Sequence, residues 1–242
     1  MNEAVFISDL HLHPEQPVIL DKFRTFVSWA AINTRSLYIL GDFLHVWPGD
    51  DALDVWSEEI VRLLAGLSEQ GIPVFFMAGN RDFLIGPTFL HQANMQSLVD
   101  PTLIHLGTES VLLSHGDAYC TQDTAHQWFR RLTRNRWFRF LFLRLPYTLR
   151  QSLVSQVRHY SQNNIRKLPA TLQTVPEAMK KDIQSFAAHI LIHGHTHQPG
   201  LRAHQHDDIS WEEYTLSDWD ENPSILCYNK SKYQFVSVSE VI

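Results

Sequence analysis

Residues 74–82 read VFFMAGNRD, an apolar run that breaks at Gly79 and continues with Asn80, Arg81 and Asp82. The run has the length and composition of a buried strand, and the glycine ends it. An amide, a guanidinium and a carboxylate then follow side by side. A buried strand with this ending predicts that the polar side chains at its end carry function.

Four other apolar runs follow the same design: AVFISDL (4–10), SLYILGD (36–42), VLLSHGD (111–117) and HILIHGH (189–195). Segments of helix length, 17–30 and 52–70, separate the first three strands, which predicts an α/β domain. Two later strand-like runs, 224–229 and 233–239, have no helix between them. We expect these two runs to form a second sheet layer.

Each of the five predicted strands stops at residues that can bind a metal ion: Asp9, His11, Asp42, Asn80, His115, His193, His195 and His197. Ligands bind at the carboxyl ends of strands in α/β sheets, so these residues can converge. Asp9 and His11 are two apart, as are His195 and His197, and an extended backbone would point each pair to one side. One such residue alone more often belongs to a turn, but five strands with this ending favour a metal site.

The ligand types predict the kind of metal. Carboxylate, imidazole and amide groups without thiolate suit two ions such as Mn²⁺, Fe²⁺, Co²⁺ or Zn²⁺. Two such ions clamp and activate a water for attack on phosphorus.

Composition bounds the remaining possibilities. The 242 residues are 44% hydrophobic, enough for one core with an insertion. No apolar stretch approaches the length of a membrane span, and the amino terminus does not resemble a secretory signal, so we expect a cytosolic protein. Cys120 and Cys227 have no metal-like spacing, and we expect free thiols.

Charge is distributed unevenly along the chain. The net charge is −6, yet residues 123–181 hold 12 of the 20 Lys and Arg and only two of the 26 acidic residues. This asymmetry favours an anionic ligand or surface that meets the segment, with a solvated helical face as the alternative. Large apolar residues interleave with its arginines, and we expect a helical insertion within a single domain that spans 1–242.

The motifs DxH (Asp9, His11), GD (41–42), GN (79–80), HGD (115–117) and GHTH (194–197), in this order, resemble those of the calcineurin-like metallophosphoesterases. The resemblance implies a double β-sheet sandwich flanked by helices. It also implies two metal sites that share Asp42 as a bridge. The first site would use Asp9, His11, Asp42 and His197, and the second Asp42, Asn80, His115 and His195.

Longer stretches narrow the resemblance. FISDLHL (6–12), GDD (49–51), GNRDFLIG (79–86), IHGHTHQP (192–199) and SDWDENPSIL (217–226) are similar to the UDP-2,3-diacylglucosamine pyrophosphohydrolases of lipid A biosynthesis. This resemblance implies two ions, with Mn²⁺ as the expected metal, and a helical insertion that acts as a lid. His45 stands where that family commonly has an acidic residue, and Ala78 where it often has His. These two departures bear on substrate contacts rather than on the reaction.

Arg81 stands where many relatives of the wider superfamily carry His, which can protonate an alkoxide leaving group. Arginine cannot act as a general acid near neutral pH, but its guanidinium can bind phosphate oxygens. A phosphate monoester leaving group needs charge stabilisation more than a proton. We therefore expect Arg81 to bind phosphate, with Asn80 and His195 at the reacting centre. Asp82 is expected to brace Arg81, or else to start the next turn.

The insertion has its own expected role. The resemblance implies that substrate contacts come from Arg81 and His195 together with Asp123, Arg158, Ser161, Asn164 and Lys167. Its Trp and Phe residues would receive acyl chains or form an ordinary helix core. The same segment could rest on an anionic bilayer, which would place the enzyme peripherally at the cytoplasmic face of the inner membrane.

The predicted reaction is hydrolysis of UDP-2,3-diacylglucosamine at the α-phosphorus, which releases UMP and 2,3-diacylglucosamine 1-phosphate. One alternative is a metallophosphoesterase that acts on a soluble nucleotide, a phosphoprotein or nucleic acid. The basic insertion and Arg81 argue against a phosphoprotein, and the acidic remainder argues against an extended nucleic-acid track. Another alternative is a noncatalytic scaffold of the same fold, although no ligand position has been lost.

Overall fold

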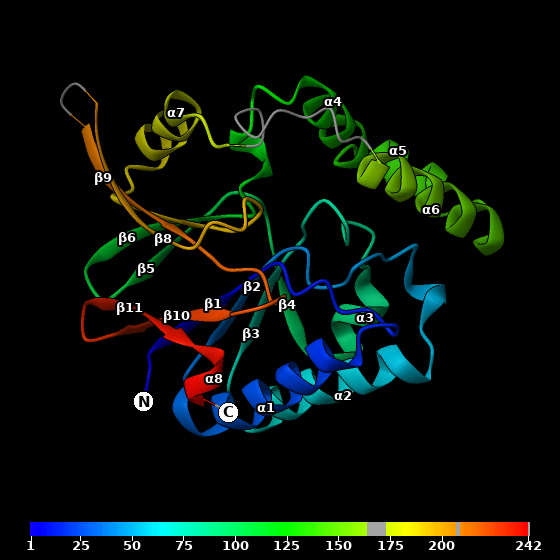
Figure 1. Ribbon diagram of the computed structural model, residues 1–242, viewed down its shortest axis with the longest axis horizontal. Coiled ribbons are helices and arrows are strands. Elements are labelled where there is room, and N and C mark those ends of the chain that lie inside the picture. The colour runs from blue at the N-terminus through cyan, green and yellow to red at the C-terminus, as the bar shows by residue number, and fades with distance from the viewer. Residues whose placement is uncertain (164–172, 207–208, 242) are drawn as a thin grey trace.

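The computed structural model describes residues 1–163, 173–206 and 209–241, with side chains described outside 158–163. Two β-sheets face each other (Figure 1). The first has the order β11-β10-β1-β2-β3-β4, in which β1 to β4 are parallel and β10 and β11 are antiparallel to their neighbours. Its strands are β1 (Ala4–Ile7), β2 (Leu37–Leu40), β3 (Val74–Met77), β4 (Met95–Leu98), β10 (Ser224–Asn229) and β11 (Lys232–Ser237).

The second sheet has the order β5-β6-β7-β9-β8. Strands β6, β7 and β9 are parallel, and β5 and β8 are antiparallel additions at the two edges. Its strands are β5 (Thr102–Leu106), β6 (Glu109–Ser114), β7 (Ile190–His193), β8 (Gly200–His206) and β9 (Ile209–Thr215).

The five strands predicted to end in ligands are present as β1, β2, β3, β6 and β7, which confirms the α/β class and the double-sheet sandwich. The expectation for 224–239 was wrong. These residues form β10 and β11, which extend the first sheet beside β1, and the second layer is built from β5 to β9. Strand pairing across more than 200 residues decides this placement, and a local apolar pattern does not encode it.

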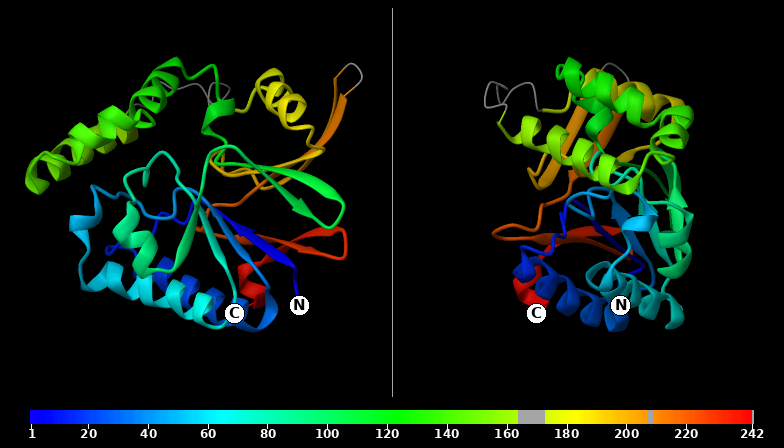
Figure 2. Two further views of the ribbon diagram at one scale, coloured as in Figure 1. Left: turned by 180° about the vertical axis from the view of Figure 1, so that it is seen from behind. Right: turned by 90° about the vertical axis from the view of Figure 1, so that its right-hand side faces the viewer.

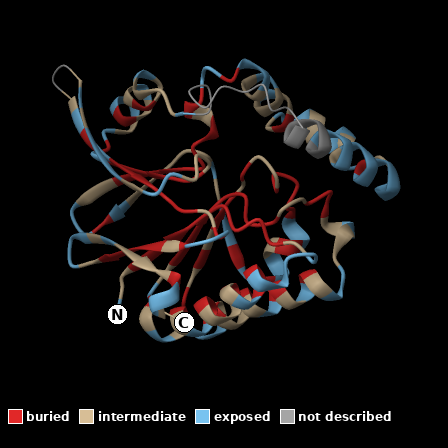
Figure 3. Cartoon of the chain, in the orientation of Figure 1, coloured by how far each residue is buried: buried red, intermediate tan, exposed pale blue. Residues whose placement is uncertain are grey.

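Alternating side chains of the strands separate three apolar cores. One face of the first sheet packs against α1 (Pro17–Asn33), α2 (Val55–Glu69) and the short helices α3 (Pro87–Gln92) and α8 (Val238–Val241). The opposite face packs against the second sheet, where Phe6 and Tyr38 meet Leu113 and Ile192. The outer face of the second sheet is covered by α7 (Pro176–Phe186). Figure 3 shows the buried strands between these layers.

Local sequence explains where the main helices begin. Pro17 occupies the first turn of α1, where the missing N–H costs no hydrogen bond. Asp54 and Ser57 form a capping box at the start of α2. The predicted helices at 17–30 and 52–70 are therefore confirmed as α1 and α2, with ends shifted by three residues or fewer.

The basic segment contains α4 (Thr124–Thr133), α5 (Arg136–Phe142) and α6 (Tyr147–Asn163), and α7 begins near its end. Figures 1 and 2 show α4 to α6 on one side of the molecule, at the edge of the sandwich away from α7. Short 3₁₀ turns, η1 (Asp50–Ala52) and η2 (Asp117–Tyr119), precede α2 and α4. Among the described residues, no helix has both the length and the apolar character needed to cross a membrane.

Cys120 and Cys227 are buried and neither forms a disulfide, as expected from their spacing. Burial raises the pKa of Cys227 to about 12, so this thiol stays protonated at neutral pH.

Candidate metal centre

The loops that follow five strands converge at one edge of the sandwich. Asp9 and His11 follow β1, Asp42 follows β2 and Asn80 follows β3 in the first sheet. From the second sheet, His115 follows β6, and His195 and His197 follow β7. All seven predicted ligands join one network of short contacts.

The backbone at these positions is left-handed rather than extended. The φ angles are 55° at Asp9, 50° at His11, 51° at Asp42, 69° at His195 and 54° at His197. Only nine non-glycine residues of the described chain have a positive φ, and five of them are predicted ligands. Such conformations are uncommon for these residue types and cluster at functional sites. The expected extended pairing of Asp9 with His11, and of His195 with His197, was therefore wrong, although each pair does converge.

Asp9, His11 and His197 form the first potential ligand group, with ligand atoms that all lie within 4.8 Å of one another. His197 Nε2 lies 3.3 Å from Asp9 Oδ1, and His11 Nε2 lies 4.0 Å from the same oxygen. Asp9 is fully buried, and its Oδ1 accepts no hydrogen bond from the described residues. The 3.3 Å approach of His197 is thus a close contact without hydrogen-bond alignment.

A second potential ligand group contains Asp9, Asp42 and His115. His115 Nε2 lies 3.7 Å from Asp42 Oδ1 and 3.0 Å from Asn80 Oδ1. The His195 ring is 5.1 Å from the His115 ring, measured between centroids. Asp42 also lies 3.3 Å from His11 Nε2, so its carboxylate stands between the two groups.

This donor set fits divalent cations. Two buried carboxylates lie among imidazole nitrogens, and Asp9 Oδ1 has no hydrogen-bond donor in the part of the chain that the structure describes. Buried polar atoms normally have partners, so Asp9 Oδ1 has the character of a metal ligand. Glycines allow the close approach: a Cβ at Gly79 would collide with Asp42, and one at Gly194 would collide with Asp9.

The electrostatics of these residues point the same way. Burial opposes the charged form of Asp9, but the close contact with His197 and the nearby His115 lower its pKa to about 2. Burial likewise opposes protonation of His197, but contacts with Asp218 and Asp9 raise its pKa to about 10. The buried carboxylates thus require positive charge beside them, which divalent cations would also supply.

Outer partners orient the ligands. His115 Nδ1 lies 2.9 Å from the carbonyl oxygen of Leu40, and His197 Nδ1 lies 3.1 Å from Asp218 Oδ2. Partners of this kind fix the orientation of metal-binding imidazoles. Asp218 was not among the predicted site residues, although it lies in the family-like stretch 217–226. The one available signal was a carboxylate just after a strand end, in SDWD.

Arg81 contacts the centre directly. Its Nε lies 3.1 Å from Asp42 Oδ2, and its backbone N–H donates to Asp42 Oδ1 at 2.9 Å. Of the two roles expected for Asp82, the structure supports the start of the next turn, because its carbonyl oxygen accepts the N–H of Ile85 at 2.9 Å, and its side chain does not brace Arg81. Asp82 is fully buried and accepts hydrogen bonds from the backbone N–H groups of Gly79 and Phe43, both at 2.7 Å. It therefore joins the loop after β2 to the loop after β3, and burial beside Asp42 raises its pKa to about 6.

The GDD stretch has structural roles that its sequence did not reveal. Asp50 accepts from the backbone N–H groups of Gly86, Thr88 and Phe89 at 2.9–3.1 Å, which caps α3 and holds the loop after Arg81. Asp51 forms an ion pair with Arg150 of α6. The two adjacent carboxylates therefore connect the loop after β3 with the basic segment.

Two arginines, one in α4 and one directly after it, reach the loops beside the metal centre. Arg130 bridges Asp117 and Asp100, at 3.0 Å in each case. Arg134 donates to the carbonyl oxygen of Ala78 at 2.7 Å, directly before the GN motif. Part of the positive charge of the basic segment therefore attaches α4 to the body of the protein.

Only one of the five substrate contacts predicted in the basic segment has a described side chain. Asp123 is buried and caps α4 by accepting the N–H of His126, whose ring lies 5.2 Å from that of His195. The side chains of Arg158 and Ser161, and the whole of Asn164 and Lys167, lie outside the described residues.

Two further histidines singled out in the sequence, His193 and His45, lie near the centre but outside both ligand groups. His193 joins neither ligand group; its Nε2 lies 2.8 Å from Oε1 of buried Glu213. His45 lies beside ligand His11, with ring centroids 6.4 Å apart. A polar residue at a strand end was therefore not sufficient to identify a ligand.

Comparisons with known proteins agree with this geometry. The family model for calcineurin-like phosphoesterases matches residues 4–199. UDP-2,3-diacylglucosamine hydrolase of Aeromonas hydrophila is 40% identical over 224 residues, covering 92% of this chain and 93% of that protein. The protein of the same name from Stutzerimonas stutzeri is 39% identical and covers 95% and 96%. That from Vibrio vulnificus is 33% identical and covers 92% of each chain.

A solved structure supports the fold alone. An archaeal phosphodiesterase superposes with a TM-score of 0.50 at 12% identity, and the alignment covers 97% of this chain and 98% of that one. The convergent ligand loops and the family match over residues 4–199 place this chain in the calcineurin-like phosphoesterase family, and it is a metallophosphoesterase by fold.

Proposed function

We propose that this enzyme hydrolyses UDP-2,3-diacylglucosamine and releases UMP and 2,3-diacylglucosamine 1-phosphate, a step of lipid A biosynthesis. The main support for this proposal is that relatives named for this substrate match more than nine-tenths of the chain at 33–40% identity. The family fold and its complete set of ligand-type side chains fit a hydrolase of phosphate anhydrides.

Asp9, His11, Asp42 and His197 would hold one divalent ion, and Asp42, Asn80, His115 and His195 a second, with Mn²⁺ as the proposed metal. Ions held by these residues would supply Lewis acidity to the phosphoryl oxygens and would favour ionisation of an attacking water. The buried carboxylates and the donor-free Asp9 Oδ1 support this assignment.

Arg81 would bind the phosphate that departs with the acylated sugar. The Arg81 side chain is 26% exposed, and its Nε lies 3.1 Å from Asp42 Oδ2, so the residue is both at the centre and accessible. The leaving group is a phosphate monoester, a stable anion, so a fixed positive charge lowers the barrier more than a proton would. Asn80 directly precedes Arg81. His195 lies at the centre on the side of the second sheet.

The helices of the basic segment would receive the diacylated sugar. Its aromatic residues divide into two sets: Phe129, Phe138 and Phe142 pack against the core, whereas Trp128 and Trp137 are each 66% exposed. An exposed apolar surface of this kind suits acyl chains. Asp123, Arg158, Ser161, Asn164 and Lys167 are the proposed polar contacts.

The same helices would hold the enzyme at an anionic membrane surface. Exposed Arg131, Arg136 and Arg144 lie in α4, in α5 and just after α5, among the exposed apolar residues Trp137, Phe140 and Leu141. Cationic and apolar side chains together favour the interface of anionic bilayers. We propose peripheral association with the cytoplasmic face of the inner membrane, where a substrate with two acyl chains would reside.

The test is hydrolysis of UDP-2,3-diacylglucosamine in detergent and ¹⁸O water by the Mn²⁺-loaded protein, with UMP followed by mass spectrometry. We expect the ¹⁸O label in UMP, because the water attacks the α-phosphorus, and a strong preference over UDP-glucose. Asp42→Asn and His197→Ala are expected to abolish turnover and keep the wild-type circular dichroism spectrum. Equal turnover of UDP-glucose would instead identify a hydrolase of soluble nucleotides.

A further inference from the structure

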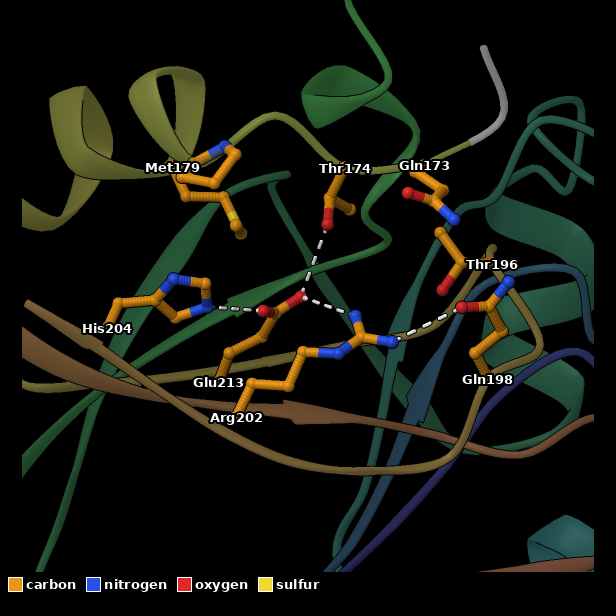
Figure 4. A pocket seen from close by; sticks show the side chains of 9 residues that line it. Gln173, Thr174, Met179, Thr196, Gln198, Arg202, His204 and Glu213 are labelled. Carbon is orange, nitrogen blue, oxygen red and sulfur yellow. Dashed lines mark hydrogen bonds and ion pairs between the residues drawn. The ribbon is translucent and has the colours of Figure 1, made fainter. Parts of the chain in front are cut away.

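A pocket of about 280 Å³ lies beside the metal centre, between α7, the stretch before it, and the hairpin of β8 and β9. Figure 4 shows the side chains that line it. They are Gln173, Thr174, Pro176, Met179, Thr196, Gln198, Arg202, His204 and Glu213. Its volume is near the lower limit of about 300 Å³ for small-molecule sites, so it suits one compact group and not an acyl chain.

The pocket is almost neutral. Arg202 is the one guanidinium or ammonium group among the described lining residues, and its Nη1 lies 3.7 Å from Oε1 of Glu213. Glu213 is also bound by His204 at 2.6 Å. With its charge balanced in this way, the pocket suits an uncharged polar group rather than a phosphate.

The polar groups of the pocket match an imide edge. Arg202 Nη2 donates to Gln198 Oε1 at 3.2 Å, so the amide NH₂ of Gln198 remains the donor toward the pocket. Gln173 contributes a second amide, and Figure 4 draws both amides on the same side of the pocket as Thr196. The imide edge of uracil presents an N–H between two carbonyl oxygens, which amide side chains complement with donor and acceptor.

The remaining walls suit a flat ring. Met179 and Pro176 provide apolar surface at the start of α7. His204 stacks on Trp211 with centroids 4.6 Å apart and planes 9° from parallel, and it is bound to Glu213. These contacts fix the wall in place, and a thioether favours contact with aromatic rings.

The position of the pocket is the decisive feature. Thr196 lines it, and the chain neighbours of Thr196 are the candidate ligands His195 and His197. Figures 1 and 2 show α7 on one side of the strand ends and the helices α4 to α6 on the other. A substrate cleaved at the metal centre would therefore extend one half toward α4 to α6 and the other half toward α7.

We infer that the pocket is the nucleoside subsite, which holds the uracil and ribose of the substrate while its phosphates lie at the metal centre. This inference rests on the proposed function, because the substrate named there has a uridine half and a diacylated half. The apolar surface of α4 to α6 suits the diacylated half, and the neutral, amide-lined pocket suits the uridine half.

Photocrosslinking locates the base directly. Mn²⁺-loaded full-length protein is irradiated with 4-thiouridine 5′-monophosphate, and the modified peptides are identified by mass spectrometry. We expect modification within 173–179 or 196–213, with protection by excess UMP but not by ribose 5-phosphate. Modification confined to α4–α6, or elsewhere outside the pocket, would overturn the subsite.

Binding measurements test the amide contact. Calorimetry with UMP and with ribose 5-phosphate compares the wild type, Gln198→Ala, and Gln184→Ala on the exposed face of α7 as a matched control. Loss of one neutral hydrogen bond predicts about three- to ten-fold weaker UMP binding in Gln198→Ala, with ribose 5-phosphate unaffected. Equal UMP affinity in all three proteins, or a parallel loss for both ligands, would contradict base recognition by Gln198.

The subsite and the proposed function can fail separately. Hydrolysis of UDP-2,3-diacylglucosamine with crosslinks outside the pocket would refute the subsite and leave the proposed function intact. Crosslinks within the pocket without hydrolysis of that lipid would support the nucleoside subsite and refute the proposed substrate.

Discussion

Single residues at the metal centre adopt conformations that the rest of the chain mostly avoids. Asp9, His11, Asp42, His195 and His197 all have left-handed backbones immediately after strands. Each strand therefore turns sharply at its end, and its polar side chain is directed toward loops of the other sheet. Their conformation explains how ligands from two sheets meet at one point.

Arg81 is the residue on which the proposed mechanism depends most. Arg81→Ala is expected to lower kcat/KM by about 100-fold or more, because charge stabilisation in the transition state is lost. Arg81→Lys should recover only part of this loss, since an ammonium cannot form the bidentate fork. Steady-state kinetics on the nucleotide lipid measures both, and a wild-type rate in Arg81→Ala would contradict the role of Arg81.

Asp218 is a positioning residue for His197, which it contacts at 3.1 Å. Asp218→Asn is expected to raise the Mn²⁺ concentration for half-maximal activity about 10- to 100-fold, as found when such outer partners are changed. Asp220→Asn, an exposed neighbour, is the matched control. Identical Mn²⁺ titrations for the two variants would refute the role of Asp218.

At the scale of elements, the insertion is held to the body by a few polar contacts. Arg150 is 2% exposed, pairs with Asp51 and donates to the carbonyl oxygens of Pro48 and Leu145. Asp50, next to Asp51, caps α3. The position of α6 is therefore coupled to the loop that carries Arg81.

Arg150→Ala is expected to loosen α6 while the two sheets stay folded, because the buried guanidinium is the main polar anchor seen for this helix. Hydrogen exchange should become at least ten-fold faster in α6 and remain unchanged in β1 to β3. Exposed Arg131→Ala serves as the control. Wild-type protection of α6 in Arg150→Ala would show that the helix is held by other contacts.

Strand β9 contributes a buried carboxylate whose charge stabilises the second sheet. Burial opposes ionisation, yet hydrogen bonds with His193 and His204 lower the pKa of Glu213 from 4.5 to about 2. A lowered pKa in the folded state stabilises the protein above pH 4.5, and this stabilisation is lost as pH falls toward 2. The lowered pKa corresponds to a contribution on the order of 3 kcal/mol to the free energy of unfolding.

Glu213→Gln should therefore lower the free energy of unfolding by about 3 kcal/mol at pH 7, and by less at pH 3. Urea denaturation at the two pH values measures this difference, with exposed Glu212→Gln as the neighbouring control. An equal loss of stability at both pH values would exclude ionisation of Glu213 as the cause.

At the scale of the whole molecule, basic residues and exposed apolar residues are concentrated in one segment of the chain. Residues 123–181 contribute +10, whereas the remaining residues contribute −16. Trp137 and Leu141, at 66% and 61% exposure, lie in α5 within this basic segment. The acidic body and the basic, apolar insertion would therefore orient the protein at an anionic surface.

Sedimentation with vesicles tests this orientation. We expect binding to anionic vesicles that weakens with salt, weak binding to zwitterionic vesicles, and about ten-fold weaker binding after Trp137→Ser combined with Leu141→Ser. Ile32→Ser on α1, which removes an apolar residue that is 74% exposed from the body, should leave binding unchanged. Equal binding of all variants would place the membrane contact elsewhere.

Local sequence determined the ligand-type residues, the five strands that precede them and the helices α1 and α2. This was possible because an apolar run that ends at a turn is encoded within about ten residues, and polar residues after a strand in an α/β sheet lie at its ligand-binding edge. The order of these motifs along the chain also indicated the family.

Only the tertiary structure decided which partners distant residues take. It placed β10 and β11 in the first sheet and paired Asp218 with His197. It also directed the carboxylate of Asp82 to the backbone N–H of Phe43 in the neighbouring loop. It also formed the pocket from segments before α7 and from β8 and β9. Such pairings depend on which distant segments pack together in the folded chain, and the local sequence pattern of each segment does not encode its distant partner.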